Sequence, residues 1–409
     1  MTAPSRLVLD NCLIIDAASP SPREGSVLIV DGRIEEVSPT PRAGRSGSRD
    51  ARVIDLQGGF LLPGFWDAHT HIGRGIPDDE ARDETAAARA LRAGRDCLRA
   101  LRLGITGLRV VGERDYIDVA CRDAFASGDH LGPTLFTCGY FITTTAGHFL
   151  SSGCAVEADG PVGFRKAVRE QIKHGVDFIK LNMDGGVMGP PWDRTTDVYL
   201  LPDEIASVFD LCRQRDFRVV AHAAGVDGVK AAVRAGAHSI EHGYVLDDEA
   251  ASMMVERGTY YIPTMGLTHL NRGPEFAESE FEREWTLANP RPEAYRQRAI
   301  AAAGPHADAF KRALKAGVKI ACGSDLALPW GGLLEMAMLV RCGMSEWQAI
   351  VAATRTAAEV CLADDDYGAV EPGKRADLVA LTANPLDDIE ATRAPSLVVK
   401  GGQVVTDPG

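Results

Sequence analysis

Two patterns of hydrophobic and polar positions occur along the chain. Near both ends, short runs alternate between apolar and polar residues and are interrupted by turn signals such as Asp31-Gly32 and Gly401-Gly402. Such runs are typical of antiparallel strands joined by hairpins. Because isolated hairpins are only marginally stable in water, we expect the two ends of the chain to form one small β-sandwich together. The Pro/Ser-rich residues 19–24 are expected to form a surface loop.

The middle of the chain repeats a different unit: an amphipathic helix pattern, a glycine, and a short β-rich run that ends in a polar residue. CLRALRLGITGLRV and FKRALKAGVKIACGSD are two examples. The glycine can end the helix in the left-handed conformation, and the run after it is apolar on both faces, as central parallel strands are. Alternating helices and strands indicate a parallel sheet. Since no GxGxxG fingerprint follows the first strand, a closed (β/α)8 barrel is favoured over an open nucleotide-binding sheet.

These patterns predict an α/β fold with three segments. Residues 63–368 are expected to form a (β/α)8 TIM barrel. Residues 1–62 and 369–409 are expected to form the N- and C-terminal parts of the composite β-sandwich. The length of 409 residues accommodates both bodies, because an α/β barrel takes about 250 residues.

Charge and composition limit the classes of partner that we expect the chain to bind. The chain has 57 acidic and 44 basic residues and a net charge of -13. An acidic surface repels phosphate groups, so we expect a small-molecule substrate and neither nucleic acid nor membrane as a partner. The chain begins without a signal-peptide pattern, contains no long uncharged apolar run, and has nine cysteines without a CxxC pair. We therefore expect a cytoplasmic protein with reduced thiols.

Polar residues occur where the predicted barrel strands end, which is the face that carries barrel active sites. His69 and His71 follow the first strand, and because one residue separates them, both imidazoles can point the same way. Lys180 lies in a run that is too apolar for an ordinary solvated lysine. Burial there would lower the pKa of its ammonium and make a neutral amine available as a ligand precursor or nucleophile.

Three more polar residues end later strands: His222, His242 and Asp325. Each has an ordinary explanation, since Asp325 could cap a helix and histidines are common in cores. Their joint placement at the strand ends of one barrel favours a shared site. Nitrogen and oxygen ligands without a thiolate fit zinc or a similar divalent ion.

With these residues in place, the sequence resembles the amidohydrolase superfamily. Its members carry HxH after strand one, a lysine after strand four, histidines after strands five and six, and an aspartate after strand eight. The resemblance covers nearly the whole chain and is carried by GGFLLPGFWDAHTH, DFIKLNMDGGVM, SIEHGYVLDDEA and GAVEPGKRADLVALTANPL. Within the superfamily the chain is most similar to the prolidase-like dipeptidases and carboxypeptidases. His148 in TAGH and Tyr244 after His242-Gly243 support this similarity.

The resemblance implies a binuclear centre with two divalent ions, zinc by preference. Lys180 would bridge the ions as a carbamate after N6-carboxylation, because two cations offset the burial of its negative charge. One ion would be held by the first-strand histidines and the barrel aspartate, the other by the two later histidines. The implied metal ligands are His69, His71, Lys180, His222, His242 and Asp325.

The implied reaction is hydrolysis of the C–N bond of an amide, such as an N-acyl amino acid or a dipeptide-like molecule. A hydroxide that bridges the metals would attack the carbonyl, and Asp325 would transfer its proton to the leaving amine. His148 and Tyr244 would stabilise the oxyanion. The resemblance also suggests a homo-oligomer. Ala146 and Phe149 depart from the glycines usual around the histidine, so the substrate can differ from a simple dipeptide.

Other readings remain open from the sequence. A hydrolase of a cyclic amide or imidazolone is one alternative, and a metal-dependent deaminase of an amino-heterocycle is another. Deaminases place a catalytic glutamate shortly after the strand-five histidine, where this chain has Ala-Ala-Gly-Val, and we expect Glu241 to point to the face opposite His242. A catalytically inactive scaffold is the third alternative. Trp192 and Trp330 are expected to overhang the barrel mouth and to favour a bulky apolar substrate group.

Overall fold

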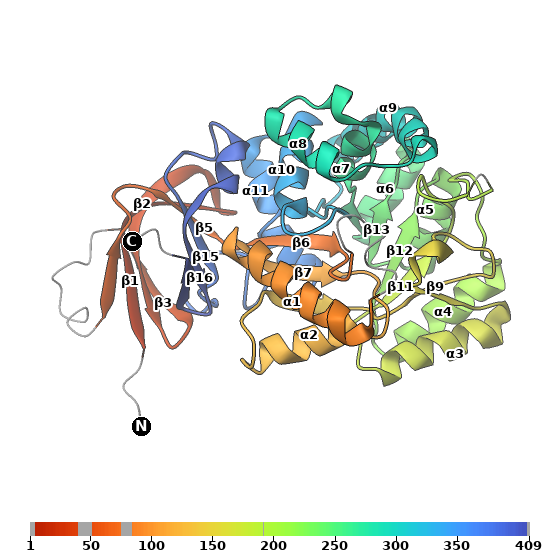
Figure 1. The fold of residues 1–409 in the computed structure, drawn as a ribbon, viewed down its shortest axis with the longest axis horizontal. Helices are drawn as coiled ribbons and strands as arrows, with labels where there is room; N and C mark the ends of the chain where they lie inside the picture. Colours follow the sequence, from red (N-terminus) through yellow and green to blue (C-terminus); the bar gives the residue numbers. More distant parts are fainter. Residues whose placement is uncertain (1–4, 40–50, 75–83, 191, 407–409) are drawn as a thin grey trace.

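A small β-sheet body lies beside a larger body of helices and parallel strands (Figure 1). The computed structural model describes residues 5–39, 51–74, 84–190 and 192–406. In Figure 1 the first strands of the chain and its last strands lie together at one end of the molecule, while the middle of the chain forms the larger body. This arrangement confirms the predicted α/β barrel with a sandwich built from both ends of the chain.

The terminal sheet has eight strands in the order β17-β16-β15-β5-β1-β2-β3, and β4 pairs with β1. β5 pairs with β1 on one side and with β15 on the other, so it joins the two ends of the chain. The predicted domain limits, after residues 62 and 368, stay predictions. The strands are β1 (Arg6–Asp16), β2 (Ser19–Val30), β3 (Arg33–Ser38), β4 (Arg52–Asp55), β5 (Phe60–Pro63), β15 (Leu378–Leu381), β16 (Pro395–Lys400) and β17 (Gln403–Thr406).

The expected surface loop at residues 19–24 is wrong, because these residues form the first half of β2. Ile14 lies opposite Arg23 and Asp16 lies opposite Ser19, which continues the β1–β2 pairing to the tight turn. β2 pairs with β3 only from Ser26 onward. The first half of β2 is therefore an edge, where proline is tolerated. Its side chains are exposed, which explains why the segment looks like a loop in sequence.

The barrel strands form two parallel sheets. One has the order β6-β7-β8, and the other has the order β10-β9-β11-β12-β13-β14. Their residues are buried almost throughout, as both-sided burial in a parallel sheet requires. The strands are β6 (Phe65–Thr70), β7 (Ile105–Val110), β8 (Thr134–Thr137), β9 (Phe141–Thr143), β10 (Ala155–Glu157), β11 (Ile179–Asn182), β12 (Val219–Ala223), β13 (Ser239–His242) and β14 (Tyr260–Ile262).

Backbone hydrogen bonds join the two parallel sheets at two seams. At the first seam, residues 319–325 run between β14 and β6: the Ala321 amide donates to the Tyr261 carbonyl, and the Ser324 amide donates to the His69 carbonyl. At the second seam, the amide of Asp177, just before β11, donates to the carbonyl of Thr137 in β8. The strand assignment is interrupted at both places. The hydrogen bonds nevertheless bring residues 319–325 into the position of a last barrel strand.

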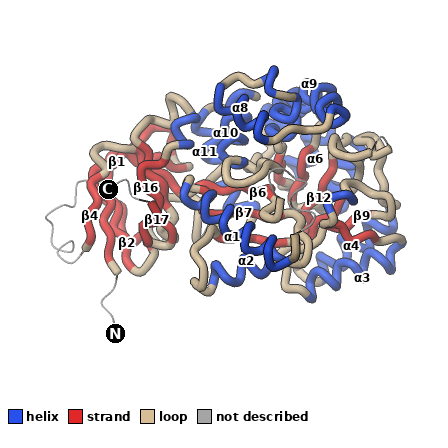
Figure 2. The backbone as a smooth tube through the Cα atoms, in the orientation of Figure 1, coloured by secondary structure: helices blue, strands red, loops and turns tan. Residues whose placement is uncertain are grey.

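Helices surround the parallel strands, as the tube in Figure 2 shows. Several end at a left-handed glycine, as the sequence predicts, including Gly236, Gly258 and Gly317. No helix in the part of the chain that the structure describes is long and apolar enough to span a membrane. The helices are α1 (Ala86–Arg102), α2 (Ile117–Ala126), α3 (Gly160–Lys173), α4 (Pro202–Gln214), α5 (Val226–Ala235), α6 (Asp248–Arg257), α7 (Met265–His269), α8 (Glu280–Ala288), α9 (Glu293–Ala316), α10 (Gly331–Arg341), α11 (Glu346–Ala352) and α12 (Arg355–Val360).

Candidate metal centre

The residues predicted for the site come together at the carboxyl ends of the barrel strands. His69 lies in β6, Lys180 in β11, His222 in β12 and His242 at the end of β13, while Asp325 follows the segment that takes the place of the last strand. Parallel pairing places these strand ends at one rim. One cavity is lined by all the predicted metal ligands and predicted oxyanion donors: His69, His71, His148, Lys180, His222, His242, Tyr244 and Asp325.

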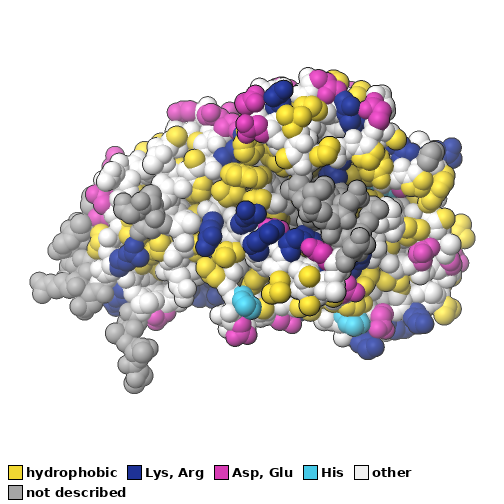
Figure 3. Space-filling view, in the orientation of Figure 1, with side chains coloured by type: hydrophobic (Ala, Val, Ile, Leu, Met, Phe, Trp, Pro, Cys, Tyr) yellow, Lys and Arg dark blue, Asp and Glu magenta, His cyan; other side chains and the backbone are white. Residues whose placement is uncertain are grey.

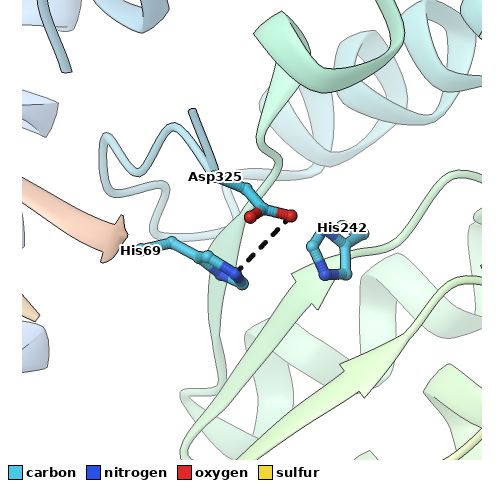
Figure 4. A group of neighbouring side chains, drawn as sticks. All are labelled: His69, His242 and Asp325. Atoms are coloured by element: carbon cyan, nitrogen blue, oxygen red, sulfur yellow. Dashed lines mark ion pairs between the residues drawn. The ribbon is translucent and has the colours of Figure 1, made fainter. Parts of the chain in front are cut away.

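His69, His242 and Asp325 converge most closely (Figure 4). One ligand atom from each lies within 4.8 Å of the others, so the three side chains could hold one ion. His69 Nε2 lies 3.9 Å from one carboxylate oxygen of Asp325, and His71 Nε2 lies 3.4 Å from the other. His69 and Asp325 belong to the first ion site implied by the resemblance, whereas His242 belongs to the second. The assignment of these residues as metal ligands stays a prediction.

A second group of imidazoles adjoins the first. The His222 ring lies 4.5 Å from the His242 ring and 4.2 Å from the His148 ring. His222 Nε2 lies 3.1 Å from the carbonyl oxygen of Gly185. His242 therefore stands between His69 on one side and His222 on the other, an arrangement suited to two ions that share neighbouring ligands.

Lys180 supplies the strongest structural signal at the site. Its side chain is buried, and Nζ has no hydrogen-bond partner among the residues that the structure describes. Desolvation lowers the pKa of the Lys180 ammonium to about 8. A buried polar atom without a partner is costly, so the surroundings of Nζ fit a group that is added after folding. A carbamate on Nζ between two cations meets this requirement.

The other titratable groups are tuned for metal binding. Burial lowers the pKa of His69 to about 4 and holds the pKa values of His222 and His242 well below the usual range, so these imidazoles are neutral at pH 7. Neutral imidazole is the form that binds a metal. Burial works against ionisation of Asp325, but the charge of Arg74 and the hydrogen bond from His71 hold the pKa of Asp325 well below its usual range. The donor set therefore fits divalent cations.

Two of these residues adopt left-handed backbone conformations. His242 has φ of 72° and Asp325 has φ of 51°. Non-glycine residues in this region cost about 1–3 kcal/mol and gather at functional sites, where the surrounding structure holds them in place. The Tyr261 hydroxyl and His306 Nε2 both lie within hydrogen-bond distance of the His242 carbonyl oxygen, at 3.0 and 3.1 Å. These contacts fix the turn that presents the His242 ring.

The expected orientation of Glu241 is wrong. Glu241 is fully buried inside the barrel, and its Oε2 lies 2.5 Å from His69 Nδ1. Arg109 in β7 donates to both oxygens of Glu241, at 2.8 and 3.0 Å. Glu241 and His242 both face the interior because the left-handed conformation of His242 ends the strand alternation on which the expectation relied. Glu241 thus fixes the ring of His69 from behind.

His148 and Tyr244 line the same cavity, at the side of His222 and His242. His148 Nδ1 lies 2.7 Å from Asp193 Oδ2, which fixes the plane of the ring. Tyr244 is buried, with its ring 5.6 Å from the His242 ring. Desolvation holds the pKa of Tyr244 well above its usual range, so the phenol keeps its proton and can serve as a donor. Both groups are close enough to the imidazoles to contact a bound substrate.

The expectation for the two tryptophans is wrong. Trp330 packs against Phe281, with ring centroids 5.1 Å apart, and Trp192 is half exposed. Neither residue lines the cavity of the site or the cavity next to it. The sequence reasoning also missed Arg109, although an arginine inside the apolar run LRVV of a predicted strand was a visible signal that a buried partner exists.

Comparison with known proteins gives consistent matches. The model of the Amidohydrolase family matches residues 60–405. Ochratoxinase of Aspergillus niger is 31% identical over 385 residues, which cover 85% of this chain and 76% of the fungal protein. The crystal structure of a Xaa-Pro dipeptidase with bound methionine in the active site is 29% identical, with a TM-score of 0.85 over 98% of this chain and 99% of that chain. A prolidase complexed with N-methylphosphonate-L-proline is 26% identical, with a TM-score of 0.86 over 98% of this chain and 100% of that chain.

Proposed function

This chain belongs to the amidohydrolase family and is a metal-dependent hydrolase of carbon–nitrogen bonds, and we propose that it uses two ions to cleave the amide bond of an N-acyl amino acid or a dipeptide-like molecule. Zinc would be the metal in this proposal, and Lys180, as a carbamate, would help to hold both ions. The similar proteins support the substrate class, because their names refer to a dipeptidase, a prolidase and an ochratoxinase.

The observation that carries the proposal is the buried amine of Lys180 among neutral imidazoles and the Asp325 carboxylate. Nζ has no hydrogen-bond partner within the described part of the chain, and its pKa of about 8 leaves a reactive fraction of neutral amine at pH 7. A neutral amine takes up CO2, whereas an ammonium does not. His69, His71 and Asp325 hold one ion in this scheme, and His222 and His242 hold the other.

Activation of water and transfer of the proton are carried out by different groups in this scheme. When bound, the ions lower the pKa of water to about 7 and supply hydroxide at neutral pH. Asp325, which is ionised, accepts the proton of the nucleophile as it attacks the carbonyl carbon. Asp325 delivers this proton to the leaving nitrogen as the C–N bond breaks, which yields a carboxylate and an amine.

The carbonyl oxygen becomes negatively charged as the nucleophile attacks, and two donors meet it in this scheme. Tyr244 donates from the hydroxyl that it keeps protonated, and His148 contributes from the ring that Asp193 fixes through Nδ1. A donor of this kind contributes on the order of 3 kcal/mol to the transition state. Losing either residue should lower kcat more than it raises KM.

A deaminase is disfavoured by the structure around Glu241. Deamination needs a carboxyl group that shuttles protons next to the substrate. The Glu241 carboxylate is held between Arg109 and His69, and these partners keep its pKa well below the usual range although burial acts to raise it. Glu241 therefore stays ionised and remains behind His69 rather than at the reacting atoms.

The decisive experiment combines metal analysis with a substrate panel. The purified protein should contain two divalent ions per chain, measured by plasma mass spectrometry, and should hydrolyse N-acyl amino acids or dipeptides with release of one amine per bond. Ammonia released from amino-heterocycles, with no amide cleaved, would show a deaminase. A protein without bound metal that regains no activity after incubation with Zn²⁺ and bicarbonate would be a scaffold, and the proposal would be wrong.

A further inference from the structure

Asn182 is the last residue of β11, two positions after Lys180, and it lines the metal-binding cavity. Its side chain is buried, and Oδ1 has no hydrogen-bond partner among the residues that the structure describes. A carboxamide carries two donor hydrogens and an acceptor oxygen, so its burial without a partner costs stability. An unpaired carboxamide in the wall of a cavity is therefore expected to meet a ligand.

The other polar side chains of this cavity already have a role in the proposed reaction. The predicted metal ligands and the two predicted oxyanion donors account for most of them, and Arg74 contacts Asp325 at 3.0 Å. Among the described residues of the lining, Asn182 is the polar side chain that remains without a role. The outer surface gives no comparable signal on the face in Figure 3, where basic, acidic and hydrophobic side chains are mixed.

Asn182 lies in a row of side chains that crosses three neighbouring strands. In β12, His222 is its partner in the pairing register. In β9, Ile142 pairs with Leu181, which places Thr143 beside Asn182 on the other side. Residues at the same level of adjacent parallel strands face the same side of the sheet, because side chains alternate along each strand. Thr143, Asn182 and His222 therefore all face the interior of the barrel.

Thr143 supplies the partner that the carboxamide lacks. It is fully buried, and its Oγ1 also has no hydrogen-bond partner in the described part of the chain. A rotation of the side-chain torsions lets the Thr143 hydroxyl donate to Asn182 Oδ1, so that the two unpaired groups satisfy each other. The other end of the carboxamide, Nδ2, is then left to face the cavity as a donor.

The neighbours of Asn182 indicate which part of an amide Nδ2 meets. The His148 ring lies 4.2 Å from the His222 ring, so a predicted oxyanion donor adjoins the metal ligand beside Asn182. Asp325, which serves the leaving nitrogen in the proposed reaction, follows a segment that is separated from β11 by β12, β13 and β14. Asn182 thus lies on the side of the carbonyl oxygen rather than on the side of the leaving nitrogen.

The chemistry of a carboxamide also favours contact with the substrate over contact with an ion. Zinc in proteins is held by cysteine, histidine, aspartate or glutamate, and a neutral amide oxygen is outside this set. Side-chain amide N–H groups are, in contrast, common donors to the oxyanion of acyl transfer. In a cavity shielded from water, such a donor is worth more than it is in solution.

We propose that Asn182 is a further catalytic residue, whose Nδ2 donates a hydrogen bond to the carbonyl oxygen of the scissile amide as this oxygen becomes negatively charged, and that Thr143 is a positioning residue that holds Oδ1. The inference rests on the proposed function, because it concerns the same amide. It adds a third donor to the two that the resemblance implies.

Asn182→Leu removes the donor and nearly keeps the volume of the side chain. With the zinc-loaded enzyme and N-benzoyl-L-alanine as the substrate, kcat should fall about 100-fold and KM should stay within about twofold, because the hydrogen bond strengthens in the transition state. Inhibition by the tetrahedral analogue N-(phenylphosphonyl)-L-alanine should weaken by a similar factor. Unchanged inhibition of the variant by this analogue would contradict the inference.

Metal content and stability separate a catalytic role from a structural one. Asn182→Leu should hold as many ions per chain as the parent enzyme. Its free energy of unfolding should not fall, because an apolar group of similar shape replaces an unpaired buried polar group. Loss of metal, measured by plasma mass spectrometry, would show that Asn182 supports an ion site and would overturn the inference. A large loss of stability with an unchanged kcat per folded molecule would overturn it as well.

Thr143 should act through Asn182. Thr143→Val should lower kcat about three- to tenfold, which is the value of one ordinary hydrogen bond, and Thr143→Ser should restore most of the activity. In the Asn182→Leu background, Thr143→Val should have no further effect on kcat. A further loss in this background would show that Thr143 acts independently of Asn182.

Gln171→Leu is the matched control. Gln171 of α3 is also a buried carboxamide, its Nε2 has no hydrogen-bond partner among the described residues, and it lies outside the lining of the metal-binding cavity. Its kcat per folded molecule should equal that of the parent enzyme. A loss of kcat as large as that of Asn182→Leu would mean that any buried carboxamide has this effect, and the inference would be wrong.

The outcomes also distinguish the inference from the proposed function. If the amide is cleaved and Asn182→Leu keeps the kcat of the parent, the proposed function stands and the inference is wrong. If no amide is cleaved, the proposed function fails, and calorimetry of the zinc-loaded proteins with N-(phenylphosphonyl)-L-alanine decides the inference. Binding at least about tenfold weaker to Asn182→Leu than to the parent and to Gln171→Leu would support it, and equal binding would overturn it.

Discussion

The terminal sheet and the barrel rim each hold a lysine that is largely shielded from solvent, but among the described residues only the first has hydrogen-bond partners. In the terminal sheet, Lys400 Nζ contacts Asp377 Oδ2 at 2.5 Å, Thr134 Oγ1 at 2.7 Å and the Thr106 carbonyl oxygen at 3.0 Å. At the rim, Lys180 Nζ has no hydrogen-bond partner among the described residues. Lys400 attaches the sheet to the barrel strands. Lys180, in contrast, is positioned to bind groups from outside the described polypeptide.

The contrast extends to neighbouring groups. Asp10 of the terminal sheet is buried and accepts a hydrogen bond from the Ser26 hydroxyl. Near Lys180, by contrast, Asn182 Oδ1 and Thr143 Oγ1 are buried without a partner in the described chain. Unpaired buried polar groups cost about 1–3 kcal/mol each. These groups of the barrel rim therefore cost stability, which is expected of a site completed by metal and substrate.

The largest effect should come from removing the unpaired lysine. Lys180→Ala should lose bound metal and reduce kcat at least about a thousandfold, because the pKa of water returns from about 7 towards 15.7 without the ions. Short carboxylic acids such as acetate or propionate should restore part of both, since they can occupy the place of the carbamate. Metal content and amide hydrolysis check this result, and a fully active variant would contradict the two-ion scheme.

The paired lysine should behave in the opposite way. Lys400→Ala leaves Asp377 buried without its cation, and breaking such a pair should lower the free energy of unfolding by about 3 kcal/mol. Metal content per folded chain should not change. Denaturant unfolding and metal analysis on the same samples check this, and a loss of metal from a stably folded variant would show that the two regions are not independent.

A smaller effect is expected at Glu241, which lies at the barrel rim but, like Lys400, has hydrogen-bond partners in the protein. Glu241→Gln weakens the contact with His69 Nδ1 and should reduce metal affinity or activity about 10- to 100-fold, as changes behind a metal ligand do. Competition with a chelator measures the affinity. The activity should recover at high zinc concentration, which would distinguish weakened metal binding from misfolding.

The last prediction concerns a buried carboxyl that has no cationic partner among the described residues. Burial raises the pKa of Glu335 from 4.5 to about 8, and its oxygens accept from the amides of Met265 and Gly266. The folded state therefore holds this proton more tightly than the unfolded state. The stability that results is complete below pH 4.5 and is lost as the pH rises through 8, by about 1.4 kcal/mol per pH unit at most.

Glu335→Gln should remove this dependence. The difference in unfolding free energy between the parent protein and the variant should shift in favour of the variant as the pH rises from 5 to 8. Chemical denaturation at several pH values measures it. A difference that stays constant over this range would mean that Glu335 has an ordinary pKa in the folded protein.

The strand ends could be predicted from sequence because each is a local signal. A polar residue after an apolar run marks the end of a strand, and parallel pairing brings such ends to one rim, as His222 and Asp325 illustrate. The joining of the chain ends in one sheet was predictable for a similar reason, since neither end can bury a sheet face alone.

What the sequence did not reveal depends on distances between segments. Arg114 and Arg291 line one cavity because two distant segments of the chain meet there, and no spacing in the sequence predicts that meeting. Trp330 was misplaced for the same reason, since its packing on Phe281 depends on how α8 and α10 approach each other. Glu241 was misoriented because one left-handed residue breaks an otherwise regular alternation.

A single residue, Gly64, separates β5 of the terminal sheet from β6, the strand that carries His69. A side chain at Gly64 would collide with Thr106, so the two strands are joined by a close and inflexible link. Trimming the C-terminal strands would remove the neighbour of β5 and would disturb the start of β6 directly. Deleting the terminal strands should therefore not give a smaller active enzyme. A transfer of the barrel into another protein would have to include these strands.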